Sequence, residues 1–288
     1  MGVSLLKPFF SIIIVCLNPG EKLKVTLDSI LMQAFTDYEI IIKDGLSEDD
    51  ISPVVANSLS IITPPFCHCG LDPASPIHIY RQSDSGIYDA MNQAVTKATG
   101  QYIYFLNCGD TLFDEQVLSN VKEYIVNDKS DSQIFYGNIF EQLTKQEVYA
   151  TPRINRFACY RNLPCHQACF YQRQLLSERP FEIRYKIRAD HEHFIWCVLE
   201  KGVKAIYIPK IIAAYEGAGF SESKLNRHQS KQEFMEITHR YMTKGEIFRY
   251  RLIMLFTLAP LRASLSRSKR FATIYNRIKK FIYQRKSL

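Results

Sequence analysis

Residues 11–17, Ser-Ile-Ile-Ile-Val-Cys-Leu, decide the fold of this chain. This near-continuous β-branched run is typical of a strand that is buried on both faces of a sheet. Residues 21–33 follow with leucine and isoleucine at helical spacing, and residues 38–43 form a second apolar run. A strand, a helix and a strand at this spacing make a βαβ unit, which implies a parallel sheet.

The same alternation continues to about residue 127 and then weakens. The pattern predicts strands over 77–80, 102–106, 134–138, 168–171 and 205–208, and helices over 86–98, 114–127, 189–201 and 223–243. Residues 59–77 are crowded with proline and glycine and read as a surface insertion, while 149–162 look charged and irregular. We therefore expect an α/β protein. Its front half is a Rossmann-like, mostly parallel sheet flanked by helices, and its back half is α+β.

The charge is uneven along the chain. Residues 240–288 hold 13 Lys or Arg and one acid, whereas the other 239 residues hold 23 Lys or Arg against 28 acids, a net of −5. The main body therefore offers no general nucleic-acid surface. We expect one domain over 8–222 and a helical, basic extension over 223–288. Basic residues beside the apolar run 252–256 suit an anionic membrane surface, although a solvated, packed helical pair would have the same composition.

We recognise no secretory signal and no membrane-spanning helix in the sequence. The N-terminus lacks a long apolar core after a basic start, and the longest late apolar run, 252–261, is ten residues, short of the roughly 18–20 that a spanning helix needs. The eight cysteines show no paired CxxC spacing, and Cys67-His68-Cys69 lacks a partner pair for zinc. These features predict a cytoplasmic protein that could lie peripherally on the inner face of the cell membrane.

Polar side chains follow the predicted strands. They are Asn18, Asp44, Asp84, Asn107 and Asp110. In a parallel sheet, ligands bind outside the carboxyl ends of the strands, where these residues would meet. An aspartate in a turn usually only caps a helix or orders a loop, and for Asp44 alone that interpretation would be preferred. Several such groups on successive strand ends favour a ligand pocket instead.

Four segments carry a specific resemblance. They are 11–18, Lys-Asp-Gly-Leu-Ser at 43–47, Ser-Asp-Ser-Gly-Ile-Tyr-Asp-Ala-Met-Asn at 83–92, and Leu-Asn-Cys-Gly-Asp at 106–110. In this order the chain resembles glycosyltransferase family 2, the inverting nucleotide-sugar transferases of the GT-A fold, over about residues 8–220. Segment 83–92 is the most diagnostic, since it resembles members that build surface polysaccharides.

The resemblance implies roles for the strand-end residues. Asp44, Asp84, Asn18 and Asn107 would contact the nucleotide of a donor, with a UDP-sugar expected, and Asp110 would hold Mg²⁺ or Mn²⁺. The chain departs from the family at Asn107, which stands where the family's D-x-D metal motif has its first carboxylate. An amide still hydrogen-bonds ribose or a metal-bound water, so we expect metal binding to be retained but weaker.

A second group of candidates lies around residue 190. The family carries two acids at this helix start, the second being the general base; Asp190 matches the base, and Ala189 replaces the first acid. Glu192 is the alternative base. A carboxylate at a helix N-terminus stays ionised more readily, yet it is often only a helix stabiliser. His191 and His193 are expected to be surface residues.

Two further segments resemble the family more weakly. His166, in His-Gln at 166–167, would line the acceptor or diphosphate side, although a histidine bonded to the backbone is equally compatible. Gly219 and Ser221 belong to a loop, Gly-Ala-Gly-Phe-Ser, that could close over the diphosphate through backbone N–H groups.

Together these features predict a metal-assisted, inverting glycosyltransferase that moves one hexosyl or N-acetylhexosaminyl unit to a glycan or lipid-linked acceptor, as in lipopolysaccharide or related polysaccharide biosynthesis. A nucleotidyltransferase is an alternative, but such enzymes usually carry a Gly-rich, basic loop after the first strand, and residues 18–21 do not match it. The other alternative is a degenerate transferase that acts as a membrane-assembly scaffold. Asn107 and Ala189, which replace carboxylates of the family, keep this alternative open.

Overall fold

The computed structural model describes residues 7–59, 76–131, 133–217 and 224–257. The strands are β1 Phe10–Cys16, β2 Tyr38–Asp44, β3 Ile77–Arg81, β4 Tyr102–Phe105, β5 Thr111–Leu112, β6 Ile134–Glu141, β7 Gln146–Val148, β8 Cys169–Gln172 and β9 Ala205–Tyr215. The helices are α1 Glu21–Leu31, α2 Ser52–Leu59, α3 Ile87–Val95, α4 Val117–Asn127, α5 Arg156–Arg161, α6 Arg173–Glu178, α7 Ala189–Leu199, α8 Lys224–Tyr241 and α9 Lys244–Phe256. A 3-10 turn, η1, spans His166–Ala168.

One sheet organises these elements, in the order β3-β2-β1-β4-β8-β6-β9-β5, with β7 paired to β6. The first four strands are parallel, as the βαβ pattern predicted. Beyond β4 the sheet is mixed, because β8 runs antiparallel to both β4 and β6 while β9 is parallel to β6. A parallel front half and an α+β back half are therefore both present.

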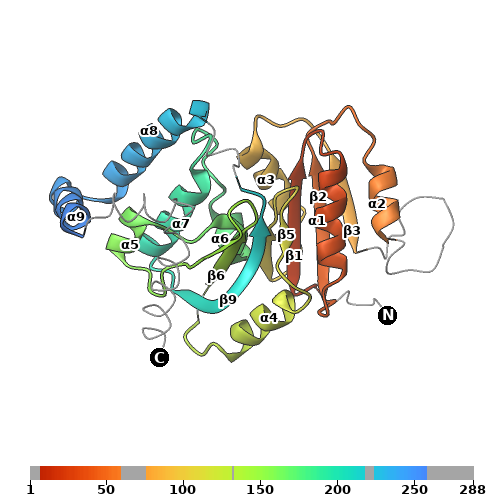
Figure 1. The fold of residues 1–288 in the computed structure, drawn as a ribbon, viewed down its shortest axis with the longest axis horizontal. Helices are drawn as coiled ribbons and strands as arrows, with labels where there is room; N and C mark the ends of the chain where they lie inside the picture. The colour runs from red at the N-terminus through yellow and green to blue at the C-terminus, as the bar shows by residue number, and fades with distance from the viewer. Residues whose placement is uncertain (1–6, 60–75, 132, 218–223, 258–288) are drawn as a thin grey trace.

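Strand β1 is buried on both faces, as its composition predicted. Ile13 faces an apolar cluster that contains residues of α3 and α7, and Ile12 and Ile14 face a second cluster that contains residues of α1 and α4. All three isoleucines are at most 1% exposed. Figure 1 shows α1 and α2 beside the β1–β3 half, with α8 and α9 at the opposite end of the molecule.

Several boundaries differ from the sequence prediction. The irregular stretch contains α5, which Asn155 caps by accepting a hydrogen bond from the backbone of Ala158. Strand β9 runs to Tyr215, well beyond the predicted end at 208, because it pairs along the whole of β6. Gly100 lies where the chain passes close to β1. A Cβ there would lie 2.7 Å from the Ser11 backbone nitrogen, so only glycine lets the chain pass β1 this closely.

The described part of the basic extension packs on the back half. On α9, Ile247 and Tyr250 are buried, and Tyr250 contacts the rings of Phe157 and Tyr160 of α5. Five other apolar side chains of α9 are at least 36% exposed, namely Phe248, Leu252, Ile253, Leu255 and Phe256. No helix within the described ranges is long and apolar enough to span a bilayer. Residues 60–75 of the predicted insertion (59–77), with Cys67-His68-Cys69, and residues 258–288 lie outside those ranges. The predicted domain boundary at 222/223 remains a prediction.

Candidate active site at the carboxyl ends of the parallel strands

The predicted strand-end residues lie along one edge of the sheet. Strands β3, β2, β1 and β4 are consecutive neighbours and parallel, so the residues that follow them lie side by side. Along this edge the candidates occur in the order Asp84, Asp44, Asn18 and the turn from Asn107 to Asp110. The sheet topology thus brings together groups that are up to 92 positions apart in the sequence (110 − 18 = 92).

The carboxylate of Asp44 orders its own turn. Its Oδ1 accepts hydrogen bonds from the Ser47 backbone at 2.9 Å and from the Ser47 hydroxyl at 2.5 Å. Its Oδ2 lies 3.3 Å from Nε of Arg81, and the side chain is 1% exposed. A nucleoside base could therefore reach this carboxylate only after Arg81 moves away from it.

Asn18 connects the first two loops. Its backbone N–H donates to the Ser47 hydroxyl at 2.8 Å, and its Oδ1 accepts from the backbone of Glu48 at 2.8 Å. The residue has a positive φ of 48°, a conformation that asparagine tolerates better than most residues. The side chain therefore holds the β1 and β2 loops together.

Asp84 is paired with a buried lysine that the sequence reasoning missed. Lys43 is 1% exposed, and its Nζ donates to Asp84 Oδ2 at 2.9 Å and to the Gln82 carbonyl at 2.5 Å. The other carboxylate oxygen of Asp84 accepts from the Gly86 backbone at 3.1 Å. The sequence did contain a signal for this pair. Lys43 stands at the end of an otherwise apolar strand, and a buried lysine requires a partner.

Asp110 is the acid of the turn after β4, and it is buried, at 6% exposed. Its Oδ1 accepts from the Glu216 backbone at 3.0 Å, and its Oδ2 from Gln167 Nε2 at 3.1 Å. Burial raises the pKa of this carboxyl above its ordinary value, with the Glu216 carboxylate adding to the effect. Asn107 closes the turn, since its carbonyl accepts the Asp110 N–H at 3.0 Å.

Glu216 and Lys22 form an ion pair beside this turn, with Lys22 Nζ 2.6 Å from Glu216 Oε2. Both side chains are 57% exposed, so the pair is accessible to a ligand. A Cβ added at Gly109 would lie 3.2 Å from Lys22 and 3.5 Å from the Glu216 carboxylate. Neither residue was among the predicted candidates.

Asp190 lies at the start of α7, as predicted, and is held by a tyrosine that sequence reasoning missed. The Tyr88 hydroxyl lies 2.7 Å from Asp190 Oδ1 and 2.8 Å from the Ile187 carbonyl, so one buried group faces both acceptors. Burial and the nearby Asp190 charge raise the pKa of Tyr88 well above its ordinary value, so it stays protonated and donates. Tyr88 belongs to segment 83–92, which brings that segment to the candidate base.

Glu192 is a structural residue in this fold. It is fully buried, its carboxylate pairs with Arg179 at 2.7 Å, and it also accepts from the Tyr241 hydroxyl of α8. Such an engaged carboxylate is poorly placed to take a proton from a substrate. Ala189 is likewise fully buried in the apolar core, so a carboxylate at that position would enter the core of this structure.

The expectation of surface histidines was wrong. His193 is 0% exposed and packs edge-on against Phe181, and burial lowers its pKa to about 4. His191 is only partly exposed, and its Nε2 is buried without a hydrogen-bond partner among the described residues. Phe234 of α8 packs against His191, and Tyr171 and Phe181 pack against His193, contacts that the local sequence of α7 did not reveal.

His166 lies within the fold rather than against a backbone group. Its ring stacks on Phe105 at 5.0 Å, and neither ring nitrogen has a hydrogen-bond partner in the described parts of the chain. The neighbouring Gln167 makes the contact to Asp110. Gly219 and Ser221 lie outside the described residues.

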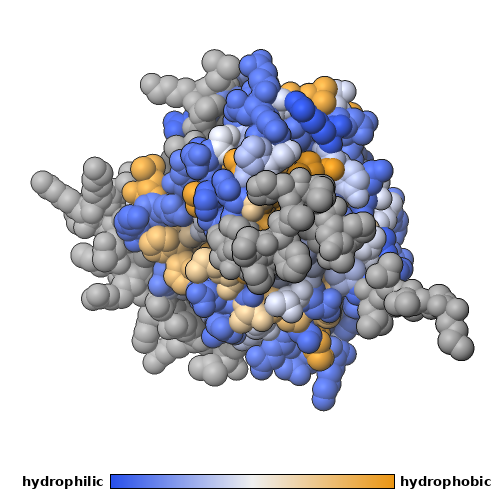
Figure 2. Space-filling view, turned by 90° about the vertical axis from the view of Figure 1, so that its right-hand side faces the viewer, coloured by the Kyte–Doolittle hydropathy of each residue, from blue (hydrophilic) through white to orange (hydrophobic). Residues whose placement is uncertain are grey.

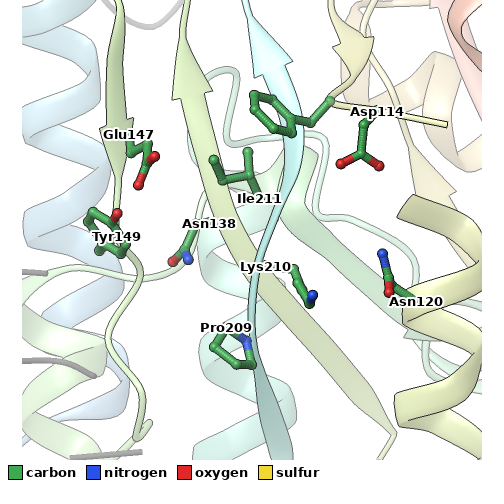
Figure 3. Close-up of a pocket in the computed structure, with 9 residues that line it drawn as sticks. Asp114, Asn120, Asn138, Glu147, Tyr149, Pro209, Lys210 and Ile211 are labelled. Carbon is green, nitrogen blue, oxygen red and sulfur yellow. The ribbon is translucent and has the colours of Figure 1, made fainter. Parts of the chain in front are cut away.

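A separate cavity of about 250 Å³ lies away from this edge. Figure 3 shows its lining, with Asn138, Glu147 and Lys210 among the side chains from β6, β7 and β9. None of the candidate donor residues lines it. The candidate site therefore depends on the strand-end loops and α7.

Comparison with known proteins gives a consistent result. Residues 11–196 match the profile of "Glycosyl transferase family 2". A curated "PGL/p-HBAD biosynthesis glycosyltransferase" of Mycobacterium bovis is 32% identical over 230 residues, covering 78% of this chain and 84% of that protein.

Solved structures share the fold at low sequence identity. A mannosyltransferase from Pyrobaculum calidifontis, solved with GDP-Man and Mn²⁺, aligns with a TM-score of 0.61 and 14% identity over 97% of this chain and 86% of that one. TarS of S. aureus, solved with UDP-GlcNAc, aligns at 0.59 and 14% over 81% and 73%. The fold is that of GT-A glycosyltransferases, and the chain belongs to glycosyltransferase family 2.

Proposed function

We propose that this glycosyltransferase moves one sugar from a nucleotide-diphosphate sugar to a glycan or lipid-linked acceptor, with inversion and with the help of a divalent cation. One observation carries the proposal. The Tyr88 hydroxyl donates to Asp190 from the helix that follows the Asp84 loop, so the carboxylate at α7 is held close to the donor edge of the sheet.

The chemistry assigned to Asp190 is proton removal. Its carboxylate takes the proton of the acceptor hydroxyl while that oxygen attacks the anomeric carbon. The bond from the anomeric carbon to the diphosphate oxygen breaks, and the nucleoside diphosphate leaves with the bonding electrons. Because attack comes from the face opposite the leaving group, the configuration inverts.

Asp110 fits a divalent cation. No group of three or more His, Cys, Asp or Glu is arranged to hold a metal within the described ranges. Mg²⁺, however, is commonly held by one or two carboxylates plus substrate phosphates. The burial that raises the pKa of Asp110 makes its negative charge costly, and a bound cation would offset that cost. Such a cation would neutralise charge on the departing diphosphate.

Solved relatives bind GDP-Man with Mn²⁺ or UDP-GlcNAc, which supports a nucleotide-sugar donor. The strand-end residues Asn18, Asp44, Asp84 and Asn107 are proposed to contact its nucleotide, and a UDP-sugar is the expected donor. The related mycobacterial glycosyltransferase, named for PGL/p-HBAD biosynthesis, supports a lipid-linked or glycan acceptor.

The exposed apolar side chains of α9 support a peripheral membrane location on the cytoplasmic face. They accompany Lys244, Arg249 and Arg251, which are also exposed. Apolar and basic side chains together suit an anionic bilayer surface. By contrast, hydrophilic residues dominate the described part of the face near α2 and β3, where hydrophobic residues occur in small groups (Figure 2).

The test is donor hydrolysis and transfer with a panel of nucleotide sugars, with Mn²⁺ and with a chelator. We expect one donor to be turned over only with the metal. Absence of turnover with every donor, in a protein that still binds nucleotide, would favour the degenerate scaffold. Turnover of a nucleoside triphosphate and a sugar phosphate would favour a nucleotidyltransferase.

A further inference from the structure

A cavity of about 330 Å³ lies beside the start of α7 and is separate from the strand-end loops. It is lined by the end of α5 and the residues after it, by Arg188 and His191, and by Phe234 of α8. Small-molecule sites usually span roughly 300–1,000 Å³, so this volume suits part of a substrate. We call it the arginine pocket.

The lining is cationic. Arg161 and Arg188 both contribute to it, and no Asp or Glu does. Neither arginine has a carboxylate within salt-bridge distance among the residues that the structure describes. A guanidinium that is partly buried normally has such a partner, since removing its charge from water is costly. Burial lowers the pKa of Arg188, which expresses that cost.

The two arginine side chains contact neutral groups instead of carboxylates. Nε of Arg188 donates to the carbonyl and hydroxyl of Ser230 at 2.7 and 2.9 Å, which leaves its terminal nitrogens for another acceptor. Arg161 lies over the Phe157 ring at 5.6 Å. His191 adds a buried Nε2 that has no hydrogen-bond partner in the described parts of the chain. Its ring is neutral near pH 7, because burial and Arg188 lower its pKa to about 4.

The position of the pocket relates it to the acceptor rather than the donor. Arg188 and His191 flank Asp190 in the sequence, and the Asp190 charge acts on both of them. The donor candidates follow β1 to β4, and none of them lines the pocket. Asp190 does not line the pocket itself, but a group bound here would contact the two residues that flank the proposed base in the sequence.

We propose that the arginine pocket binds an oxyanion, a phosphate or a carboxylate, carried by the acceptor. The guanidinium fork matches both groups with two parallel hydrogen bonds, and Arg161 and Arg188 would each supply such a fork. The neutral His191 would donate one more hydrogen bond from Nε2. This proposal rests on the proposed transferase function, because it assigns the pocket to that reaction's acceptor.

The experiment uses the full chain and three proteins. Thermal unfolding is titrated with phosphate, with acetate and with chloride at equal ionic strength, for the wild type, Arg161→Gln and the control Arg249→Gln. Arg249 also lies over an aromatic ring, that of Tyr250 at 5.2 Å, but it is exposed and outside the pocket. Arg188 is left intact because it also anchors Ser230.

We expect phosphate or acetate to raise the Tm of the wild type and of the control beyond the effect of chloride. In Arg161→Gln the apparent Kd should be about tenfold weaker or more, the usual consequence of losing a hydrogen bond to a charged group. A response to phosphate alone identifies a phosphorylated acceptor, and a response to acetate alone identifies a carboxylated one. Equal responses in Arg161→Gln and the wild type, or no response beyond chloride, would overturn the proposal.

A calorimetric titration with UDP and Mn²⁺ separates this proposal from the proposed function. Arg161→Gln should bind the nucleotide as the wild type does. If Arg161→Gln loses nucleotide affinity, the pocket belongs to the donor and the acceptor assignment is wrong. If the wild type binds neither UDP nor, in the same titration with Mn²⁺, any other nucleoside diphosphate, the proposed function fails, while the phosphate titration still reports on the pocket.

Discussion

Replacing Tyr88 by phenylalanine tests the contact that holds the candidate base. The substitution keeps the ring in its buried place and removes only the hydroxyl that faces Asp190 at 2.7 Å and the Ile187 carbonyl at 2.8 Å. A hydrogen bond to a charged group contributes about 1.5–3 kcal/mol. If the bond orients Asp190 for proton removal, losing it should reduce kcat by roughly 10- to 100-fold, since 1.4 kcal/mol corresponds to about a factor of ten.

Tyr38→Phe is the matched control. Its hydroxyl donates to the Ile30 carbonyl at 3.1 Å, at the opposite end of β2 from the site. Both variants should unfold at lower temperature, and Tyr38→Phe should lose only about 0.5–1.5 kcal/mol of the free energy of unfolding. Steady-state transfer with the cognate donor, together with denaturant unfolding, gives both numbers.

The decisive quantity is kcat, with the donor KM expected to change little. If Tyr88→Phe is folded and keeps kcat within twofold of the wild type, the hydroxyl does not position a catalytic carboxylate. If Tyr38→Phe loses as much activity as Tyr88→Phe, the effect is a general loss of stability and the reasoning is refuted.

The remaining predictions concern the base, the metal site and the membrane surface. Asp190→Asn should keep donor binding by calorimetry and lose transfer by roughly 10²–10⁴-fold, the usual contribution of a positioned general base. Asp110→Ala should abolish metal-dependent donor binding in calorimetry with nucleotide and Mn²⁺. The Tm of Asp110→Asn minus the Tm of the wild type, measured without metal, should increase from pH 4 to pH 7. Replacing Phe248, Leu255 and Phe256 together by serine should weaken sedimentation with anionic vesicles while the Tm stays close to that of the wild type.

The sign of the Asp110 effect follows from linkage. Burial raises the folded-state pKa of this carboxyl above the unfolded value, so the folded protein binds more protons in the intervening pH range. The stability of the wild type therefore falls as the pH rises from the unfolded-state pKa through the folded-state pKa. The amide of Asp110→Asn does not titrate, so the variant lacks this loss. A difference in Tm between variant and wild type that is the same at both pH values would contradict it.

Other outcomes would move the remaining assignments. Near wild-type turnover in Asp190→Asn would place the base elsewhere, and unchanged nucleotide affinity in Asp110→Ala would remove the metal from that turn. If vesicle binding survives the serine substitutions, it depends on the basic side chains of α9 or on residues beyond 257. We prefer these substitutions to the removal of residues 245–288, because Ile247 and Tyr250 are packed against the domain and their loss would disturb its fold.

Local pattern explains why the front half of the fold could be predicted and much of the back half could not. Strand β1 and helix α1 follow directly from a β-branched run and an amphipathic period. Helix α5 has only six residues, and its cap at Asn155 gives a weak signal in a polar stretch. Strands β5 and β7 have two and three residues, too short for any alternation to appear.

The sequence by itself determined the parallel front of the sheet and the series of polar groups at its strand ends, because periodicity and turn residues act locally. Tertiary structure alone decided which groups meet. Tyr88 and Asp190 are 102 positions apart, and only the packing of α3 against the start of α7 brings them within 2.7 Å. From its local sequence, His193 was expected on the surface of α7, and Glu192 was the alternative base. Both are buried for different reasons. Arg179 and Tyr241 supply partners from across the fold, which compensate the cost of removing the Glu192 charge from water, whereas His193 is neutral and packs against the ring of Phe181.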